Sequence, residues 1–136
     1  MEVALALAGV RTMLVSAPAV TAITDDIFVD LAPPEQPYPF VVISLQSSTD
    51  TYGVGPTRIF TDCEVLVRGY MGVDSYEPLS PLADAIDAAM STVTASTTAG
   101  VVLSARRIRP YAQLEEYEAG EVRALGGLYR IFAQGA

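Results

Sequence analysis

Three features of the sequence predict one α+β domain. A segment from Arg58 to Arg68 alternates in polarity with period two, as a strand with one buried face does. Amphipathic helical patterns open the chain over residues 3–15 and follow that strand over residues 80–93. Strands in runs with two such helices predict an antiparallel or mixed sheet of about five strands, with the two main helices packed on one face.

Length and composition restrict the possible classes of protein. The chain has 136 residues, enough for one core and hence for a single domain over residues 1–136. It contains no His, and eight basic residues face sixteen acidic ones, for a net charge of -8. Such a molecule should repel nucleic acid and anionic membranes. No apolar run is long enough to span a membrane, and the segment 3–10 lacks the flanks of a signal peptide, so we expect no targeting.

The first forty residues should contain two helical segments and a short strand. The helix over residues 3–15 is expected to stop at Ser16–Pro18, where a short second helical turn begins. Asp25 and Asp26 then form a turn before a strand over residues 27–31. Four prolines over residues 33–39 force an extended connector, which we interpret as a rigid loop rather than a ligand for a partner domain.

A central apolar strand over residues 41–45 leads into a polar stretch, Ser47–Thr57. That stretch is longer than a hairpin needs, so we predict a flexible loop. Gly53 and Gly55 do not make a phosphate loop, because no Lys follows and no helix opens there. Long loops often carry binding work. The predicted partner-docking loop consists of Asp50, Thr51, Tyr52, Gly53, Val54 and Gly55.

The strand from Arg58 to Arg68 should have two different faces. Its odd positions, from Ile59 to Val67, are apolar or small and predict the buried face. Cys63 lies among them and should be a buried structural thiol, since no His exists to activate it. The other face mixes charges with apolar side chains, which suits a subunit interface. The predicted interface residues are Arg58, Phe60, Asp62, Glu64, Leu66 and Arg68.

Ser80 and Pro81 mark the start of the next helix as its N-cap and first residue. A start one turn earlier, at Asp74 or Ser75, would place Pro81 inside the helix, so we favour the later start. The apolar stripe then continues to Val93.

The last third of the chain should contain two or three strands. One covers residues 101–109, and residues 111–117 form either a further strand or a connector. The final strand covers residues 122–132, where Gly126–Gly127 is predicted to bulge or bend it.

The basic residues of this region form one cluster. Three charges without interleaved aromatics, close to several glutamates, make a weak nucleic-acid site. Pairing with acidic side chains, within the chain or across a subunit boundary, is the better interpretation. The predicted charge pairs join Arg106, Arg107 and Arg109 to Glu115, Glu116 and Glu118.

The residue types that enzymes use are scarce in this sequence. No His can act as a base, and the acidic residues fall in turns or on exposed strand faces, where a glycosidase pair is not expected. Metal-ligand, dinucleotide and phosphate-loop patterns are absent from the sequence. We therefore expect no catalysis, no cofactor and no metal, and a domain built for protein contacts.

Several segments together resemble one family. They are the opening helix with Arg11–Leu14, SAPAVTAITDDIF (16–28), PYPFVVISL (37–45), RIFTDCEVLVRGY (58–70) and LADAIDAAM (82–90). This arrangement resembles the tail-terminator, or tail-completion, proteins of long-tailed bacteriophages. The resemblance covers most of residues 1–90 and thins beyond them.

The resemblance implies a virion protein, assembled in the host cytoplasm, that forms a ring, hexameric in this family, on the head-proximal end of the tail tube. The ring would stop tube polymerisation, dock to a head connector or stopper, and let DNA pass through its lumen unread. The acidic surplus fits such passage, since few cations are present to hold a polyanion. In that setting the outer face of the strand from Arg58 to Arg68 lies at the subunit interface or lumen, and the loop Ser47–Thr57 contacts the tube or connector.

Three alternatives stay open at this point. The nearest is another protein of the same neck, such as a head-tail connector, a stopper or a head-completion protein. A generic oligomeric interaction module is the second. An acid-dependent glycosidase is the third, and a deep cleft with two carboxylates would be needed to support it.

Overall fold

The strands of the chain belong to one sheet. The computed structural model describes residues 2–55, 58–72, 75–91, 95–97, 100–117 and 120–135. Within them the strands are β1 (Ile27–Val29), β2 (Phe40–Tyr52), β3 (Arg58–Met71), β4 (Ala95–Thr97), β5 (Gly100–Tyr117) and β6 (Gly120–Gly135).

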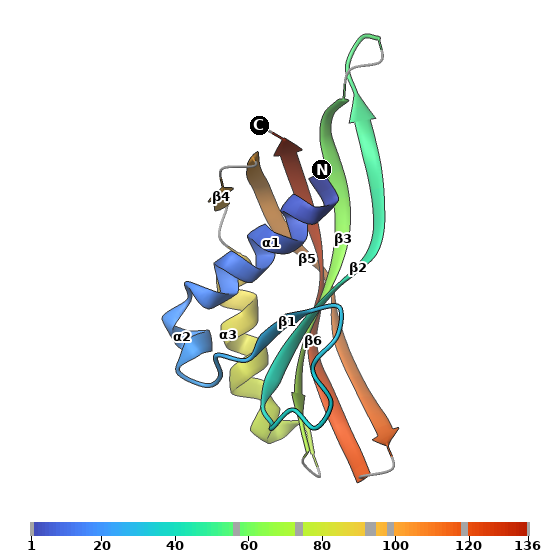
Figure 1. The fold of residues 1–136 in the computed structure, drawn as a ribbon. Coiled ribbons are helices and arrows are strands. Elements are labelled where there is room, and N and C mark those ends of the chain that lie inside the picture. Colours follow the sequence, from blue (N-terminus) through green and yellow to red (C-terminus); the bar gives the residue numbers. More distant parts are fainter. Residues whose placement is uncertain are drawn as a thin grey trace.

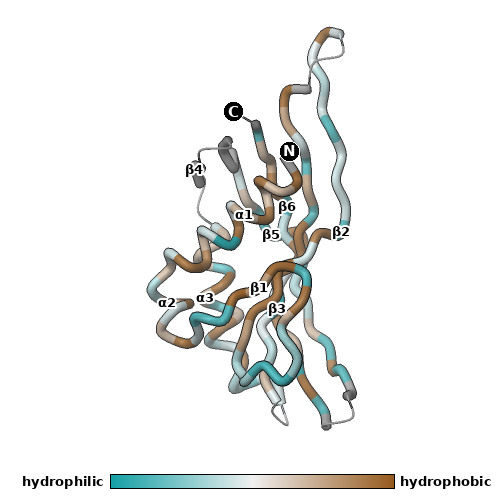
Figure 2. The backbone as a smooth tube through the Cα atoms, viewed as in Figure 1, coloured by the Kyte–Doolittle hydropathy of each residue, from teal (hydrophilic) through white to brown (hydrophobic). Residues whose placement is uncertain are grey.

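The helices cover one face of that sheet. They are α1 (Glu2–Val15), α2 (Pro18–Thr21) and α3 (Ser80–Met90), the last preceded by the 3-10 turn η1 (Glu77–Leu79). Residues of α1 and α3 share one hydrophobic core with β3 and β6, and both helices lie on the same side of the sheet (Figure 1). Hydrophobic stretches run along α1, β1 and β3 (Figure 2).

The sheet is mixed and has the strand order β1-β2-β3-β6-β5-β4. β1 runs parallel to β2, and each of the other neighbouring pairs is antiparallel. The α+β prediction, with a mixed sheet of about five strands and two main helices on one face, is therefore confirmed. The apolar strand predicted as central is an inner strand, β2, while β3 and β6 occupy the middle.

The helix after β3 begins close to the favoured position but is capped differently. α3 starts at Ser80 itself, and Leu79 occupies the N-cap without a side-chain hydrogen bond. The predicted Ser80 cap is therefore wrong. The reason lies in η1, where the backbone carbonyl of Tyr76 already accepts from the N–H groups of both Leu79 and Ser80. α3 ends at Met90, and Val93 lies outside the described residues.

The predicted flexible loop Ser47–Thr57 is largely a strand. β2 continues to Tyr52, and its residues 47–52 pair with residues 58–64 of β3. The prediction was wrong because polar side chains can line a strand whose hydrogen bonds go to a long neighbour. Beyond the helices, β2 and β3 form a projecting arm (Figure 1), with the turn residues 53–55 near its end and residues 56–57 outside the described part.

β5 is one strand, so its second half, Tyr111–Tyr117, is neither a separate strand nor a connector. Irregular pairing occurs in β5, between Arg107 and Arg109 among other places. Residues 61–71 of β3 pair with residues 123–133 of β6 without any shift in register. The bulge predicted at Gly126–Gly127 is therefore absent from this pairing. Gly126 instead allows β3 and β6 to approach closely, because a Cβ at this position would lie 1.9 Å from the carbonyl oxygen of Val67.

The core is centred on β3 and β6. Thr61, Cys63, Val65 and Val67 are buried as their odd positions predicted, whereas Ile59 lies on the projecting arm and is 46% exposed. The Tyr129 hydroxyl donates to Asp87 of α3 at 3.0 Å. Burial and then Asp87 raise the pKa of Tyr129, so the hydroxyl keeps its proton and the bond holds α3 to the sheet.

Replacing Gly126 by Ala should unfold much of the sheet, because the new methyl group would overlap the backbone of β3. We expect the free energy of unfolding, measured by urea titration, to fall by at least about 3 kcal/mol. Gly72→Ala is the matched control, since its Cβ would meet the Tyr38 ring at an ordinary 3.5 Å. Equal effects of the two substitutions would contradict this explanation.

Cys63 should make stability depend on alkaline pH. Burial and then the carboxylates of Asp62 and Asp50 raise the pKa of its thiol from 9.0 to about 11. The pKa of the thiol is higher in the folded state than in the unfolded state. The contribution of the neutral, buried thiol to the free energy of unfolding is therefore fully present below pH 9 and is lost as pH rises through 11. It amounts to roughly 2 to 3 kcal/mol. Urea titrations between pH 8 and 11 should give a shallower decline for Cys63→Ala than for the wild type, and parallel declines would refute it.

Candidate subunit interface on the open face of the sheet

The even positions of β3 point away from the helices, onto the face that we call the open face. Antiparallel register places Asp62 opposite Phe132, Glu64 opposite Arg130, and Leu66 opposite Leu128 on this face. Of the predicted interface residues, the structure thus brings together Phe60, Asp62, Glu64, Leu66 and Arg68. Arg58 begins the strand on the arm.

Asp62 is already engaged within its own chain. The Arg130 guanidinium on β6 donates through Nε to both carboxylate oxygens of Asp62, at 2.9 and 3.1 Å. The hydrogen bond and charge of Asp62 raise the pKa of Arg130, so the cation is permanent. Arg130 also lies over the ring of Phe132, which meets Phe60 edge-on at 5.2 Å between centroids. Charge reversal at Asp62 would therefore disturb the monomer, and Glu64 is the cleaner position for testing assembly.

The proline-rich loop, residues 30–39, covers the part of the open face that contains Phe40, Val42, Tyr70 and Val122. Two residues with positive φ, Asp30 and Glu35, reverse its course. Its end is held by the buried Thr24, whose hydroxyl donates to the carbonyl of Pro39 at 2.8 Å. The rigid loop predicted from the prolines thus folds back over the sheet and encloses a groove.

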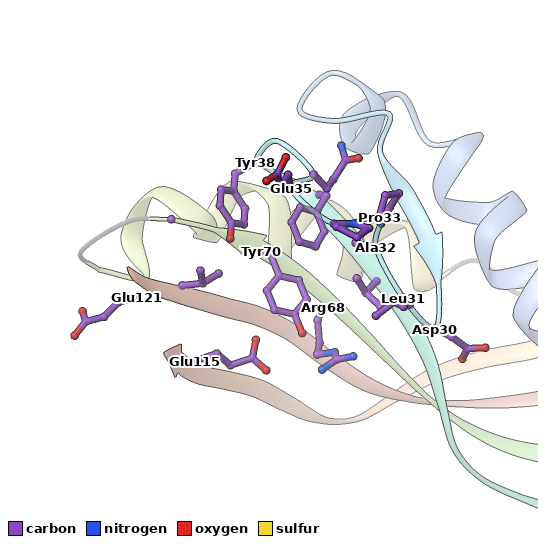
Figure 3. A pocket seen from close by; sticks show the side chains of 16 residues that line it. Asp30, Leu31, Ala32, Pro33, Glu35, Tyr38, Arg68, Tyr70, Glu115 and Glu121 are labelled. Atoms are coloured by element: carbon purple, nitrogen blue, oxygen red, sulfur yellow. The ribbon is translucent and has the colours of Figure 1, made fainter. Parts of the chain in front are cut away.

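The groove has a volume of about 840 Å³, and its floor is an aromatic stack. Tyr38 stacks on Phe40 at 5.3 Å, and Phe40 stacks on Tyr70 at 5.1 Å between ring centroids. Val42 and Val122 complete the floor and are almost fully buried. Figure 3 shows the loop on one side of the groove and Glu115 and Glu121 on the other.

Arg68 lies at one end of this stack (Figure 3). Its guanidinium carbon is 5.4 Å from the centroid of the Tyr70 ring, and one terminal nitrogen donates to Ser44 at 3.3 Å. Its Nε is buried and has no hydrogen-bond partner within the described structure. An unpaired buried donor is costly, so Arg68 Nε lowers the stability of this fold locally.

The rim of the groove is acidic. Asp30, Glu35 and Glu121 line it with exposed carboxylates, and Glu115 lies beside them, partly buried. An apolar floor with an acidic rim favours a ligand that is apolar in the middle and basic at its ends.

The arginine cluster lies elsewhere, on the outer part of β5. Arg107 forms an ion pair with Asp87 of α3 at 3.8 Å, while Arg106 and Arg109 pair in register with the open-face residues Arg130 and Leu128. Six residues of extended strand, about 20 Å, separate Arg109 from Glu115. Arg109 and Glu115 are therefore too far apart to pair directly within one chain, and the other predicted pairs, including those with Glu116 and Glu118, stay predictions. Glu118 lies outside the described residues.

The predicted docking residues lie at the far end of the arm. Asp50, Thr51 and Tyr52 are strand residues, and Asp50 accepts from the Thr61 hydroxyl at 2.7 Å. Tyr52 is 54% exposed, and Val54 is exposed completely. Apolar side chains therefore project at the tip, as a contact with another protein would require.

Sequence reasoning missed the groove and Arg130. Tyr38, Phe40 and Tyr70 are spread over three segments, and only the folded loop stacks them. One local signal was available, because Tyr38 and Phe40 flank Pro39 and therefore sit in a rigid stretch.

The described residues contain neither a metal-ion cluster nor a membrane-spanning helix. Nowhere in this part of the chain do three or more His, Cys, Asp or Glu side chains lie close enough together to hold a metal ion. None of the helices there combines the length and apolar character of a membrane span.

Arg68→Met should leave the monomer about as stable as before. It removes a cation-π contact but also an unpaired buried donor, so we expect the free energy of unfolding to change by less than about 1 kcal/mol. Arg130→Met is the comparison, since it leaves the partly buried Asp62 without its guanidinium and should lower stability measurably more. Urea titration of both variants decides, and a larger loss for Arg68→Met would contradict the local cost assigned to the unpaired Nε.

The sequence matches no protein-family model and no curated protein. Ten chains of solved structures match the fold. One of them is a chain from the virion of a native gene transfer agent particle, with a TM-score of 0.72, 19% identity, and coverage of 98% of this chain and 98% of that one. The two chains therefore share one fold over their whole lengths.

Proposed function

We propose that the chain is a structural protein of a virion, and more narrowly the tail terminator of a long-tailed bacteriophage. The observation that carries the proposal is the fold shared along 98% of both chains with a component of an assembled virion particle. The segments between residues 1 and 90 that resemble tail terminators support the narrower role. In this role the protein acts by assembly and binds no cofactor.

Assembly into a ring is supported by the sheet. One face is covered by helices, and the open face carries both the Asp62–Arg130 pair and the groove. β1 and β4 cover only short parts of their neighbours, so β2 beyond Ile43 and β5 beyond Val102 have free edges in the described structure. These edges differ, since that of β2 is polar and that of β5 carries Arg106, Arg107 and Arg109. Unlike surfaces on opposite sides of a subunit favour head-to-tail contacts, which close into rings when the rotation allows.

The projecting arm supplies a contact for the next component of the tail or neck. It extends beyond the helices (Figure 1), and its exposed Tyr52 and Val54 offer apolar area. In the proposed ring these tips meet the tube protein or the head connector.

The charges suit a lumen through which DNA passes. The net charge is -8, and the guanidinium groups of Arg11, Arg107 and Arg130 are engaged with partners in the chain. Few cations then stay available to displace the counterions of DNA, so the polyanion can move without being held.

Electron microscopy of lysates from a virus that lacks this chain tests the role. Overlong tails of variable length, detached from DNA-filled heads, are expected because nothing would stop tube growth. Tails of normal length that fail to join would reassign the chain to a connector, stopper or head-completion protein. Intact virions would refute a neck protein altogether.

Complementation in the same experiment tests the arm. Wild-type chain should restore joined virions, whereas a chain lacking Thr51–Gly55 should fold, as judged by circular dichroism, and fail to restore them. Full rescue by the shortened chain would remove the arm from the docking surface.

A further inference from the structure

The groove on the open face requires an occupant of defined chemistry. Its floor is apolar and aromatic, and its rim carries the carboxylates of Asp30, Glu35 and Glu121. The volume of about 840 Å³ lies within the range of ligand clefts, about 300 to 1,000 Å³. A peptide segment with a central apolar side chain and flanking cations would match the floor, the rim and the volume.

The outer edge of β5 presents such a segment. β4 pairs only with residues 100–102, so beyond them the described chain offers β5 no outer strand partner. Here Arg106, Ile108, Arg109 and Pro110 are exposed, Ile108 by 43%. The shift in pairing between Arg107 and Arg109 takes Ile108 out of the regular register.

Recognition of this segment must work through side chains. A proline, an irregular register and closely spaced cations all disfavour the addition of another strand to this edge. Arg107 is held by Asp87 at 3.8 Å, which leaves Arg106 and Arg109 as the cations on the side of the open face.

We propose that the groove of one copy binds the Arg106–Pro110 segment of a neighbouring copy. This inference rests on the proposed function, because it presupposes that copies assemble into a ring. Ile108 enters the aromatic floor, and Arg106 and Arg109 pair with Glu35 and Glu121 on the rim. Each copy then contributes one groove and one segment, which is a head-to-tail contact.

A charge-swap experiment tests this pairing. The segment variant is Arg106→Glu/Arg109→Glu, and the groove variant is Glu35→Arg/Glu121→Arg. Both Asp30 and Glu35 have a positive φ, of 67° and 60°. Asp30 is left unchanged because Asp favours this conformation, whereas Glu and Arg are similarly disfavoured at position 35. Glu77→Arg/Asp84→Arg is the control, since it makes the same charge change as the groove variant at exposed positions of η1 and α3. Oligomeric mass is measured by native mass spectrometry and sedimentation velocity, and folding by circular dichroism.

Each of the two variants alone should stay folded and need an at least tenfold higher concentration for half-assembly. An equimolar mixture should restore rings in which the two variants alternate, because a reversed segment then faces a reversed groove. The control should assemble like the wild type.

Different failures have different meanings. The docking assignment would be overturned if the wild type forms rings and both variants assemble equally well. It would also be overturned if the mixture of variants fails to form rings. Both outcomes leave the proposed function intact. Loss of binding to tube or connector protein with intact rings would assign the groove to that partner instead. A wild-type chain that stays monomeric at all concentrations would overturn both the inference and the proposed ring.

Discussion

The two main helices can cover only one face of the central strands β3 and β6, and the rest of the structure depends on this constraint. Their helix side is closed by α1 and α3, with the Tyr129–Asp87 hydrogen bond fastening α3. The strands must also approach closely, which requires Gly126 beside the carbonyl of Val67. The opposite face then has to be covered without a helix. It uses a charge pair between Asp62 and Arg130, and a loop that folds back from β1.

The cover on the open face is incomplete, and its gaps are where contacts with other molecules are expected. The proline-rich loop buries Val42 and Tyr70 but leaves a groove with an acidic rim. Arg68 lies at the end of this groove, against the ring of Tyr70. β2 and β3 are also longer than the layer of helices, so they extend as an arm with an exposed tip. Both features fit a subunit completed by its neighbours, as the proposed ring requires.

The site could be predicted from the sequence only in part. Alternation along β3 placed Phe60, Asp62, Glu64 and Leu66 on one face correctly, since side-chain direction in a strand is a local property. The role of Asp62 was beyond reach, because its partner Arg130 is 68 residues away. The residues from Asp50 to Tyr52 were misjudged for a related reason, since their polar composition is typical of loops and only the pairing with β3 makes them a strand.

The sequence by itself determined the two main helices, most of the strands and the buried side of β3 with Cys63 in it, because these follow from residue periodicity. It did not determine that residues 47–52 are strand. Only the tertiary structure decided where the proline-rich loop lies, which aromatic rings stack beneath it, and why Gly126 must be a glycine. Those outcomes depend on segments far apart in the chain coming within contact distance, and no local pattern of residues encodes such a distance.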